Sequence, residues 1–190
     1  VGVSHSTSYV NASAINIMEN KEDKHVEYLK DCLIPKQSWH EKFDRYWEPG
    51  ETGAQKKLIE FLDKGLSGYA DGRNRPGLNN VSRLSPHIHF GEISPSEIAN
   101  FLKDIDSEDK ERFYTELVWR EFSYNLLFFN PAIDTVNLQE KFDSFPWLEN
   151  KVYLDAWKNG NTGYPIVDAG MRELWETGYM HNRVRMIVGS

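Results

Sequence analysis

Hydrophobic residues recur at intervals of three and four along most of the chain beyond Trp39, which is the spacing of one face of an α-helix. The first such run predicts a helix that ends near Gly65 or Gly68. Its apolar positions are Ala54, Leu58, Phe61, Leu62 and Leu66. The polar, glycine-containing stretch that follows, residues 69–85, predicts a loop.

A capping sequence marks the start of the next helix. Ser94 can serve as the N-cap, Pro95 suits the first helical position, and Glu97 completes a capping box. Ile93 and Ile98 flank this start and can pack together as a hydrophobic staple. We therefore predict a helix that begins at Pro95.

Further helices are predicted downstream. The longest begins near Ser107 and continues to about Phe129, and its apolar positions are Phe113, Leu117, Val118, Phe122, Leu126 and Leu127. The others are predicted over residues 148–158, 166–177 and 181–190. Since no stretch alternates apolar and polar residues over the length of a strand, the predicted fold class is all-α.

The first 38 residues, Val1 to Ser38, show no sustained period and are rich in Ser, Asn and charged residues. They predict a linker or an irregular arm, with a partly disordered terminus as the alternative. We therefore expect an N-terminal arm (1–38) and a partial helical domain (39–190), since 190 residues suit one well-packed domain.

The chain is acidic, with a formal net charge of −7. A net negative charge disfavours non-specific binding to nucleic acid, although it is compatible with a local basic site. Cys32 is the single cysteine and can form no internal disulfide, which indicates a reducing compartment. With no bilayer-length apolar run and no signal peptide in the sequence, we expect a cytoplasmic protein without membrane contact.

Polar and aromatic residues share one face of the long predicted helix. Glu116, Trp119, Arg120 and Ser123 occupy positions i, i+3, i+4 and i+7. A carboxylate, an indole, a guanidinium and a hydroxyl form an unusual core surface and hence a candidate site. An ordinary Glu–Arg pair beside a core tryptophan is the commoner arrangement and remains the alternative.

Two further segments carry candidate chemistry. In the last predicted helix Asn182, Arg185 and Met186 share a face beside Arg183. The asparagine and arginine can donate to a carbonyl or a phosphate and the methionine can pack against a ring, with solvated surface charge as the alternative. Residues 81–86 contain two serines and can cradle a phosphate, although Ser- and Pro-containing turns without ligands are far commoner. No pattern typical of a metal site, a nucleophile elbow or a Walker loop is present.

Five motifs follow one another along the chain. They are Trp47-Glu48-Pro49-Gly50-Glu51, Ser82-Arg83-Leu84-Ser85-Pro86-His87-Ile88-His89-Phe90-Gly91-Glu92, Trp119-Arg120-Glu121-Phe122, Thr162-Gly163-Tyr164-Pro165-Ile166-Val167-Asp168-Ala169 and Met180-His181-Asn182-Arg183. Their order and spacing resemble the photolyase/cryptochrome family from about Trp39 to Ser190. The resemblance implies the multi-helical FAD-binding domain of that family.

By this resemblance the chain is part of a light-driven DNA repair flavoprotein, a deoxyribodipyrimidine photo-lyase, which is a carbon–carbon lyase. In that family photoexcited reduced FAD, bound in a U-shaped conformation, passes an electron to a cyclobutane pyrimidine dimer flipped out of DNA, and the dimer splits. The implied partners are FAD and UV-damaged DNA. Because Asn182 and Met186 match, the chain is most like a class I cyclobutane pyrimidine dimer photolyase. A cryptochrome-type blue-light photoreceptor and a flavin-free helical interaction module remain alternatives.

The resemblance also assigns site residues. Glu116 matches the acid that hydrogen-bonds the lesion, and Trp147 matches the outer member of a tryptophan chain that reduces the flavin, so both are catalytic candidates. The cofactor-binding candidates are Tyr69, Val81, Ser82, Arg83, Leu84, Ser85, Phe113, Arg120 and Arg185. The candidates for binding DNA and its lesion are Arg73, Glu116, Trp119, Arg120, Ser123, Asn182, Arg183 and Met186.

Some features depart from the family pattern. Val81 stands where a hydroxyl residue is usual, and Phe113 and Tyr179 replace more typical tryptophans. No counterpart of the N-terminal α/β antenna domain is recognised, so no antenna pigment is assigned. The domain is expected to be truncated on its C-terminal side, before the flavin-contacting aspartates. We therefore expect the 190-residue chain alone to bind FAD weakly or not at all and to be inactive.

Overall fold

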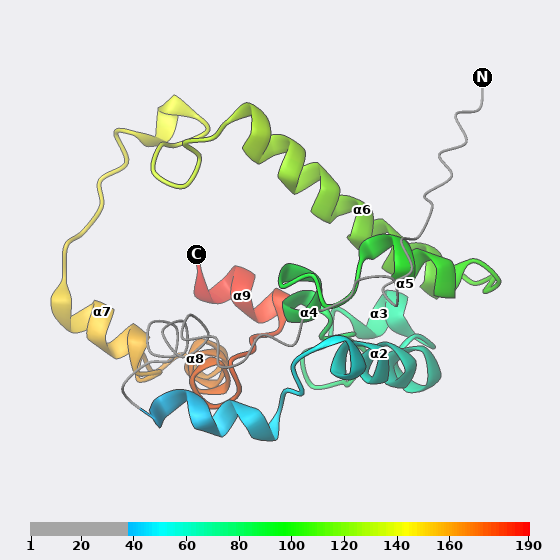
Figure 1. The fold of residues 1–190 in the computed structure, drawn as a ribbon. Coiled ribbons are helices and arrows are strands. Elements are labelled where there is room, and N and C mark those ends of the chain that lie inside the picture. The colour runs from blue at the N-terminus through cyan, green and yellow to red at the C-terminus, as the bar shows by residue number, and fades with distance from the viewer. Residues whose placement is uncertain (1–37) are drawn as a thin grey trace, which may run out of the picture. The chain divides into compact units, whose positions relative to one another are not determined.

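A computed structural model describes residues 38–190, and every regular element in that range is helical (Figure 1). The elements are η2 (Ser38–Arg45), α2 (Glu51–Glu60), η3 (Phe61–Gly65), α3 (Tyr69–Gly72), α4 (Ser85–His89), α5 (Pro95–Leu102), α6 (Glu108–Phe129), η4 (Glu140–Phe142), α7 (Lys151–Lys158), α8 (Pro165–Thr177) and α9 (Asn182–Val188). The predicted all-α class is confirmed. Apart from Ser38, the predicted N-terminal arm lies outside the described residues. All the packing considered below lies within residues 41–190, which form one unit.

Side-chain caps begin the helices where the sequence predicts them. Ser94 Oγ accepts a hydrogen bond from the backbone N–H of Glu97 (3.0 Å), and Ser107 Oγ accepts one from that of Lys110 (3.1 Å). Each bond satisfies one of the N–H groups that the first turn of a helix leaves without a helical partner. The predicted starts of α5 and α6 are therefore confirmed.

The predicted loop over residues 69–85 is wrong at its beginning, where α3 forms. Gly68, in a left-handed conformation with φ of 77°, precedes this short helix. The Asp109 carboxylate accepts hydrogen bonds from the backbone N–H groups of Gly68 (2.8 Å) and Ala70 (2.7 Å). Because Asp109 belongs to the first turn of α6, the contact that stabilises α3 comes from a distant part of the chain and is absent from the local pattern.

A first hydrophobic core is formed by residues of α2, η3, α3, α5 and α6 together with the segments between them. It comprises Ala54, Leu58, Phe61, Leu66, Tyr69, Leu84, Ile93, Ile98, Leu102, Phe113 and Leu117. The two residues of the predicted staple, Ile93 and Ile98, are both members. Burial of such side chains is the main favourable term in folding.

The apolar face predicted for α6 is only half buried. Phe113 and Leu117 lie in the core, whereas Val118, Phe122 and Leu127 are exposed. The expected helix is thus confirmed in its position, and only the N-terminal part of its apolar face is buried. Helices α3 and α5 are the elements that pack most extensively against α6.

A second core joins α8 to α9 and consists of Met171, Met180, Val184 and Val188, with Val167 packed against it. The turn that leads into α8 is held by Asp168, whose carboxylate accepts hydrogen bonds from the N–H (2.7 Å) and hydroxyl (2.7 Å) of Thr162 and from Gly163 N–H (3.0 Å). These bonds, that of the Thr162 hydroxyl first, lower the pKa of Asp168.

The other end of α8 is tied to the segment before α2. Trp47 Nε1 donates to the backbone carbonyl of Thr177 (2.6 Å), and the Trp47 ring lies 6.2 Å from the rings of both His87 and Tyr179. His87 in turn is hydrogen-bonded through Nδ1 to Glu92 (2.5 Å). These contacts fix the start of α9 relative to α4, and so position one wall of the cavity described next.

Candidate functional site

A cavity of about 250 Å³ lies where α3, α4, α6 and the start of α9 meet. It is lined by Tyr69, Arg73, Val81, Ser82, Ser85, Ile88, Phe113, Glu116, Leu117, Arg120, His181 and Asn182. Six of the predicted cofactor-binding residues line it, namely Tyr69, Val81, Ser82, Ser85, Phe113 and Arg120. Arg73, Glu116 and Asn182, from the predicted DNA-binding set, line the same cavity. The structure thus brings together residues that the sequence separates by more than a hundred positions.

Aromatic rings support the inner side of this cavity. Phe113 lies 4.6 Å from Phe61 and 5.4 Å from Tyr69, measured between ring centroids, and the pairs are tilted or edge-to-face. Both geometries are favourable for rings. Burial raises the pKa of Tyr69 to about 12, so its hydroxyl stays protonated at neutral pH and can donate a hydrogen bond.

Glu116 forms an ion pair with Arg73, the C-cap residue of α3, in which the guanidinium donates to the carboxylate. The pair joins α3 to α6 at the edge of the cavity, and both side chains are mostly buried. The alternative of a Glu116–Arg120 pair along the helix is not what forms. Arg120 instead donates to the hydroxyl of Tyr124 (2.6 Å) and lies over that ring at 4.9 Å.

Trp119 and Ser123, on the same helix face, do not line the cavity. Trp119 is 56% exposed and meets only the edge of Phe122 among ring contacts in the described residues. The Ser123 hydroxyl donates to the backbone carbonyl of Trp119 (3.0 Å). Both side chains therefore face outward beside the cavity rather than into it.

The start of α9 supplies the opposite wall. Asn182 lines the cavity, and Arg183 donates to the side-chain carbonyl of Asn74 (2.9 Å), which links α9 to the segment after α3. Met186 accepts a weak contact from Arg183 (3.6 Å) and, like Arg185, is exposed. Arg73 is thus held by Glu116 and Arg183 by Asn74, whereas Arg185 does not line the cavity.

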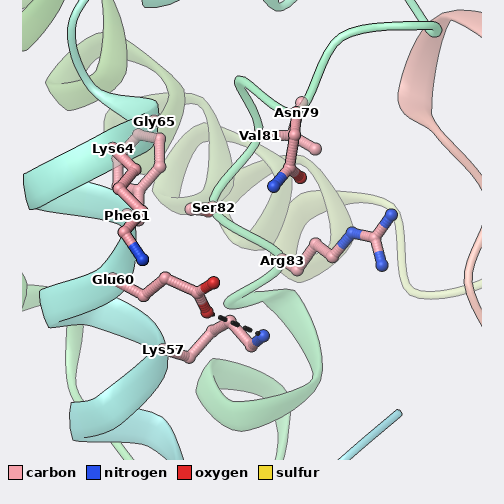
Figure 2. A pocket seen from close by; sticks show the side chains of 9 residues that line it. All are labelled: Lys57, Glu60, Phe61, Lys64, Gly65, Asn79, Val81, Ser82 and Arg83. Atoms are coloured by element: carbon pink, nitrogen blue, oxygen red, sulfur yellow. Dashed lines mark hydrogen bonds and ion pairs between the residues drawn. The ribbon is translucent and has the colours of Figure 1, made fainter.

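The segment of residues 79–85 separates this cavity from a second one of about 340 Å³. Figure 2 shows Lys57, Glu60 and Lys64 on one side of the second cavity and the segment Asn79–Arg83 on the other. Val81 and Ser82 line both cavities. The second cavity contains only three of the predicted cofactor-binding residues, so the smaller cavity is the better candidate.

Arg83 and Leu84 serve this segment in other ways. Arg83 has a positive φ of 54°, which is rare for a residue with a side chain. Its guanidinium lies 4.8 Å from the Tyr179 ring and 4.0 Å from Glu173 of α8. Leu84 is buried in the first core. The two residues anchor the segment, and its serines face the cavity.

Trp147 lies apart from the cavity. It is 80% exposed, and its ring lies 4.7 Å from that of Phe145. Trp157, ten positions further on, donates through Nε1 to the backbone carbonyl of Val188 (2.9 Å). No interaction in the described part of the chain connects Trp147 to the residues that line the cavity, so its expected role stays a prediction.

Three lining residues, Ile88, Leu117 and His181, were not predicted as site residues. Ile88 and Leu117 add apolar wall. His181 is 3% exposed, and its Nε2 atom is buried without a hydrogen-bond partner in the structure. The sequence signal was the position of His181 directly before Asn182, in a motif whose next residues were already candidates.

The donor set of this cavity suits an anionic, ring-containing ligand. Serine hydroxyls, the Tyr69 hydroxyl, the Arg120 guanidinium and the unpartnered His181 nitrogen offer hydrogen bonds, while aromatic rings offer an apolar floor. An unpaired buried donor is unfavourable unless a ligand or water satisfies it. Among residues 38–190, no group of three or more His, Cys, Asp or Glu is placed to hold a metal ion, and no helix is long and apolar enough to cross a membrane.

Comparisons with known proteins point to one group. Residues 113–190 match the family described as the FAD binding domain of DNA photolyase. The chain is 49% identical over 163 residues to the deoxyribodipyrimidine photo-lyase of Agrobacterium fabrum, covering 83% of this chain and 34% of that protein. It is 41% identical over 157 residues to cryptochrome-2 of Arabidopsis thaliana, covering 77% of this chain and 26% of that protein.

A solved structure agrees with these relatives. The crystal structure of a bacterial class III photolyase from Agrobacterium tumefaciens superposes with a TM-score of 0.81 at 46% identity, covering 89% of this chain and 36% of that one. The chain thus spans about a third of the length of the photolyases it matches.

Proposed function

Since this chain belongs to the photolyase and cryptochrome family, we propose that it forms part of the FAD- and lesion-binding domain of a DNA photolyase that splits cyclobutane pyrimidine dimers. The observation that carries the proposal is the convergence of cofactor-type and lesion-type residues on one cavity. The serines of the segment 81–85 and the protonated Tyr69 hydroxyl supply donors, and Glu116 and Asn182 supply polar groups at a neighbouring edge.

When bound, reduced FAD supplies the light-driven electron. The chain's own residues bind and orient the cofactor and the lesion. Ser82, Ser85 and Arg120 offer donors for phosphates and hydroxyls, and the edge-to-face rings of Tyr69 and Phe113 form an apolar floor.

Glu116 is the side chain that we assign to the lesion. The Arg73 ion pair holds its carboxyl group at the wall of the cavity, near Asn182, where a flipped-out pyrimidine could reach both. As the ionised partner of Arg73, the Glu116 carboxylate accepts hydrogen bonds, such as one from a pyrimidine N–H, and so can hold the lesion in place. The side-chain amide of Asn182 can donate to a pyrimidine carbonyl and stabilise charge that develops there, without the reorganisation that water requires. We propose that Arg73, paired with Glu116, and Arg183, which donates to Asn74, add positive charge that attracts DNA phosphates to this part of the surface.

The relatives include a photolyase of another class and also cryptochromes. The match at 46% identity is to a class III photolyase, whereas the motifs favour class I, and the class I expectation stays a prediction. A second candidate function is that of a cryptochrome-type photoreceptor, favoured by the 41% identity to cryptochrome-2. Light-dependent repair distinguishes the two.

The test uses the protein in its full-length form and an oligonucleotide that contains a cyclobutane dimer. Glu116→Ala should lower the repair yield roughly tenfold while the flavin content per protein persists, because a single polar contact to the lesion is lost. Glu121→Ala, an exposed carboxylate on the same helix, is the matched control and should repair normally.

An unchanged yield in Glu116→Ala would remove Glu116 from the mechanism. Tightly bound flavin without any repair by the unaltered protein would favour the photoreceptor. A purified full-length protein without flavin would favour the interaction module instead.

A further inference from the structure

His181 occupies a position that local structure alone does not explain. It is the N-cap residue of α9, and its Nδ1 atom accepts a hydrogen bond from the backbone N–H of Arg183 (3.2 Å). The imidazole is 3% exposed and lines the cavity shared by α3, α6 and α9. The cap uses one ring nitrogen and leaves the other to face its surroundings.

The cap determines what the second nitrogen can do. Because Nδ1 accepts a hydrogen bond, it carries no proton, and the neutral ring must carry its proton on Nε2. Burial, with the nearby charges of Arg183 and Arg83, lowers the pKa of His181, so the ring is neutral at physiological pH. Nε2 is therefore a neutral N–H donor, and within the described residues it is buried without an acceptor.

The surroundings indicate the kind of acceptor that is missing. The charges that act on His181 are both positive, and Arg83 Nε is the other buried side-chain atom without a partner in the part of the chain that the structure describes. Ser82 and Ser85, from the same segment as Arg83, line the same cavity as His181. Unsatisfied donors beside guanidinium groups favour an anionic oxygen over a neutral carbonyl.

We propose that the Nε2–H group of His181 donates a hydrogen bond to a phosphate oxygen of the dinucleotide cofactor. This inference rests on the proposed function, which places FAD in the cavity. It makes His181 a cofactor-binding residue that also begins α9, so one side chain couples the position of Asn182 to the bound phosphate.

Two substitutions separate the cap from the donor. Asparagine places an acceptor oxygen near the position of Nδ1 and is among the best N-cap residues, but it cannot reach the position of Nε2. Glutamine reaches that position with an amide N–H. In the protein in its full-length form, freed of flavin, His181→Asn should weaken FAD binding about tenfold or more with little change in melting temperature, and His181→Gln should recover most of the affinity.

Binding is measured by titration of the flavin-free protein with FAD and readout of flavin fluorescence, and folding by circular dichroism. The phosphorus NMR signals of FAD, bound at saturation, identify the acceptor. They should shift in His181→Asn and return toward the original position in His181→Gln.

Unchanged affinity in His181→Asn would overturn the inference and leave the proposed function intact. So would equal losses in both variants, or a weaker affinity with unchanged phosphorus signals, which would place the acceptor on the flavin or ribityl part. Failure of the unaltered flavin-free protein to bind FAD at all would overturn the proposed function, and the inference with it.

Discussion

The contact between α8 and α9 depends on the absence of a side chain at Gly170. A Cβ atom built at this position would lie well inside 3.0 Å of Val184 Cγ1, a distance that real Cβ atoms essentially never show. It would also lie 3.3 Å from Val188 Cγ2. Gly170→Ala therefore requires Val184, and with it part of α9, to move away from α8.

Two opposing effects set the magnitude. Alanine is favoured over glycine inside a helix by about 1 kcal/mol. Overpacking of a filled contact costs about 1–3 kcal/mol, and the upper part of that range applies because the clashing residue is a β-branched valine with few alternative rotamers in a helix. We expect a net loss of about 1–2 kcal/mol in the free energy of unfolding. The shift of α9 should also weaken FAD binding, since Asn182 and His181 begin that helix.

The measurement is urea unfolding of the protein in its full-length form, followed by circular dichroism. Gly77→Ala is the matched control, because no atom lies within 4 Å of the added Cβ and the residue has no positive φ. It should be neutral or stabilising by about 0.4–1 kcal/mol, through loss of unfolded-state entropy. A Gly170→Ala protein as stable as the unaltered one, or more stable, would refute the packing argument.

Two further predictions concern stability. Ser107→Ala should lower the free energy of unfolding by about 1 kcal/mol, because the first turn of α6 loses the hydrogen bond from Lys110 N–H to the Ser107 hydroxyl. Ser123→Ala is the control and should change little in the same urea assay, since its hydroxyl bonds a carbonyl of its own exposed helix. Equal effects of the two substitutions would contradict the role of the cap. Hydrogen bonding to His87 lowers the pKa of Glu92 below its ordinary 4.5, so its contribution is present above pH 4.5 and lost as pH falls through the lower folded-state pKa. An acid-unfolding curve of equal steepness in Glu92→Gln would contradict this.

The sequence predicts best what is decided locally. The caps at Ser94 and Ser107 involve a side chain and a backbone N–H only three residues away, so the local sequence is enough to predict the hydrogen bond. The left-handed Gly178 that ends α8 is of the same kind. Helix α3 was missed because its stabilising acceptor, Asp109, lies about forty residues further along the chain.

The side-chain partners in the cavity likewise depend on contacts between elements that are distant in sequence. Helical spacing correctly placed Glu116 and Arg120 on one face, but it could not reveal that Glu116 pairs with Arg73 and leaves Arg120 to Tyr124. Ion-pair choice depends on which element packs across the helix, and here that element is α3. Trp119 shares the periodicity of Glu116 and yet faces outward, because a helix face about 100° wide can straddle the edge of a cavity.

The five motifs that carried the resemblance divide by physical role once their contacts are known. Trp47 ties its segment to the end of α8, and Asp168 holds the turn that begins α8, so these two motifs maintain the frame without lining the cavity. The serine segment and, from α6, Glu116 and Arg120 line it directly. His181 belongs to both groups, since one ring nitrogen caps a helix and the other is left to meet a ligand. A residue with two such duties constrains fold and site together, which explains why a histidine, with two distinct nitrogens, suits this position better than an ordinary capping residue.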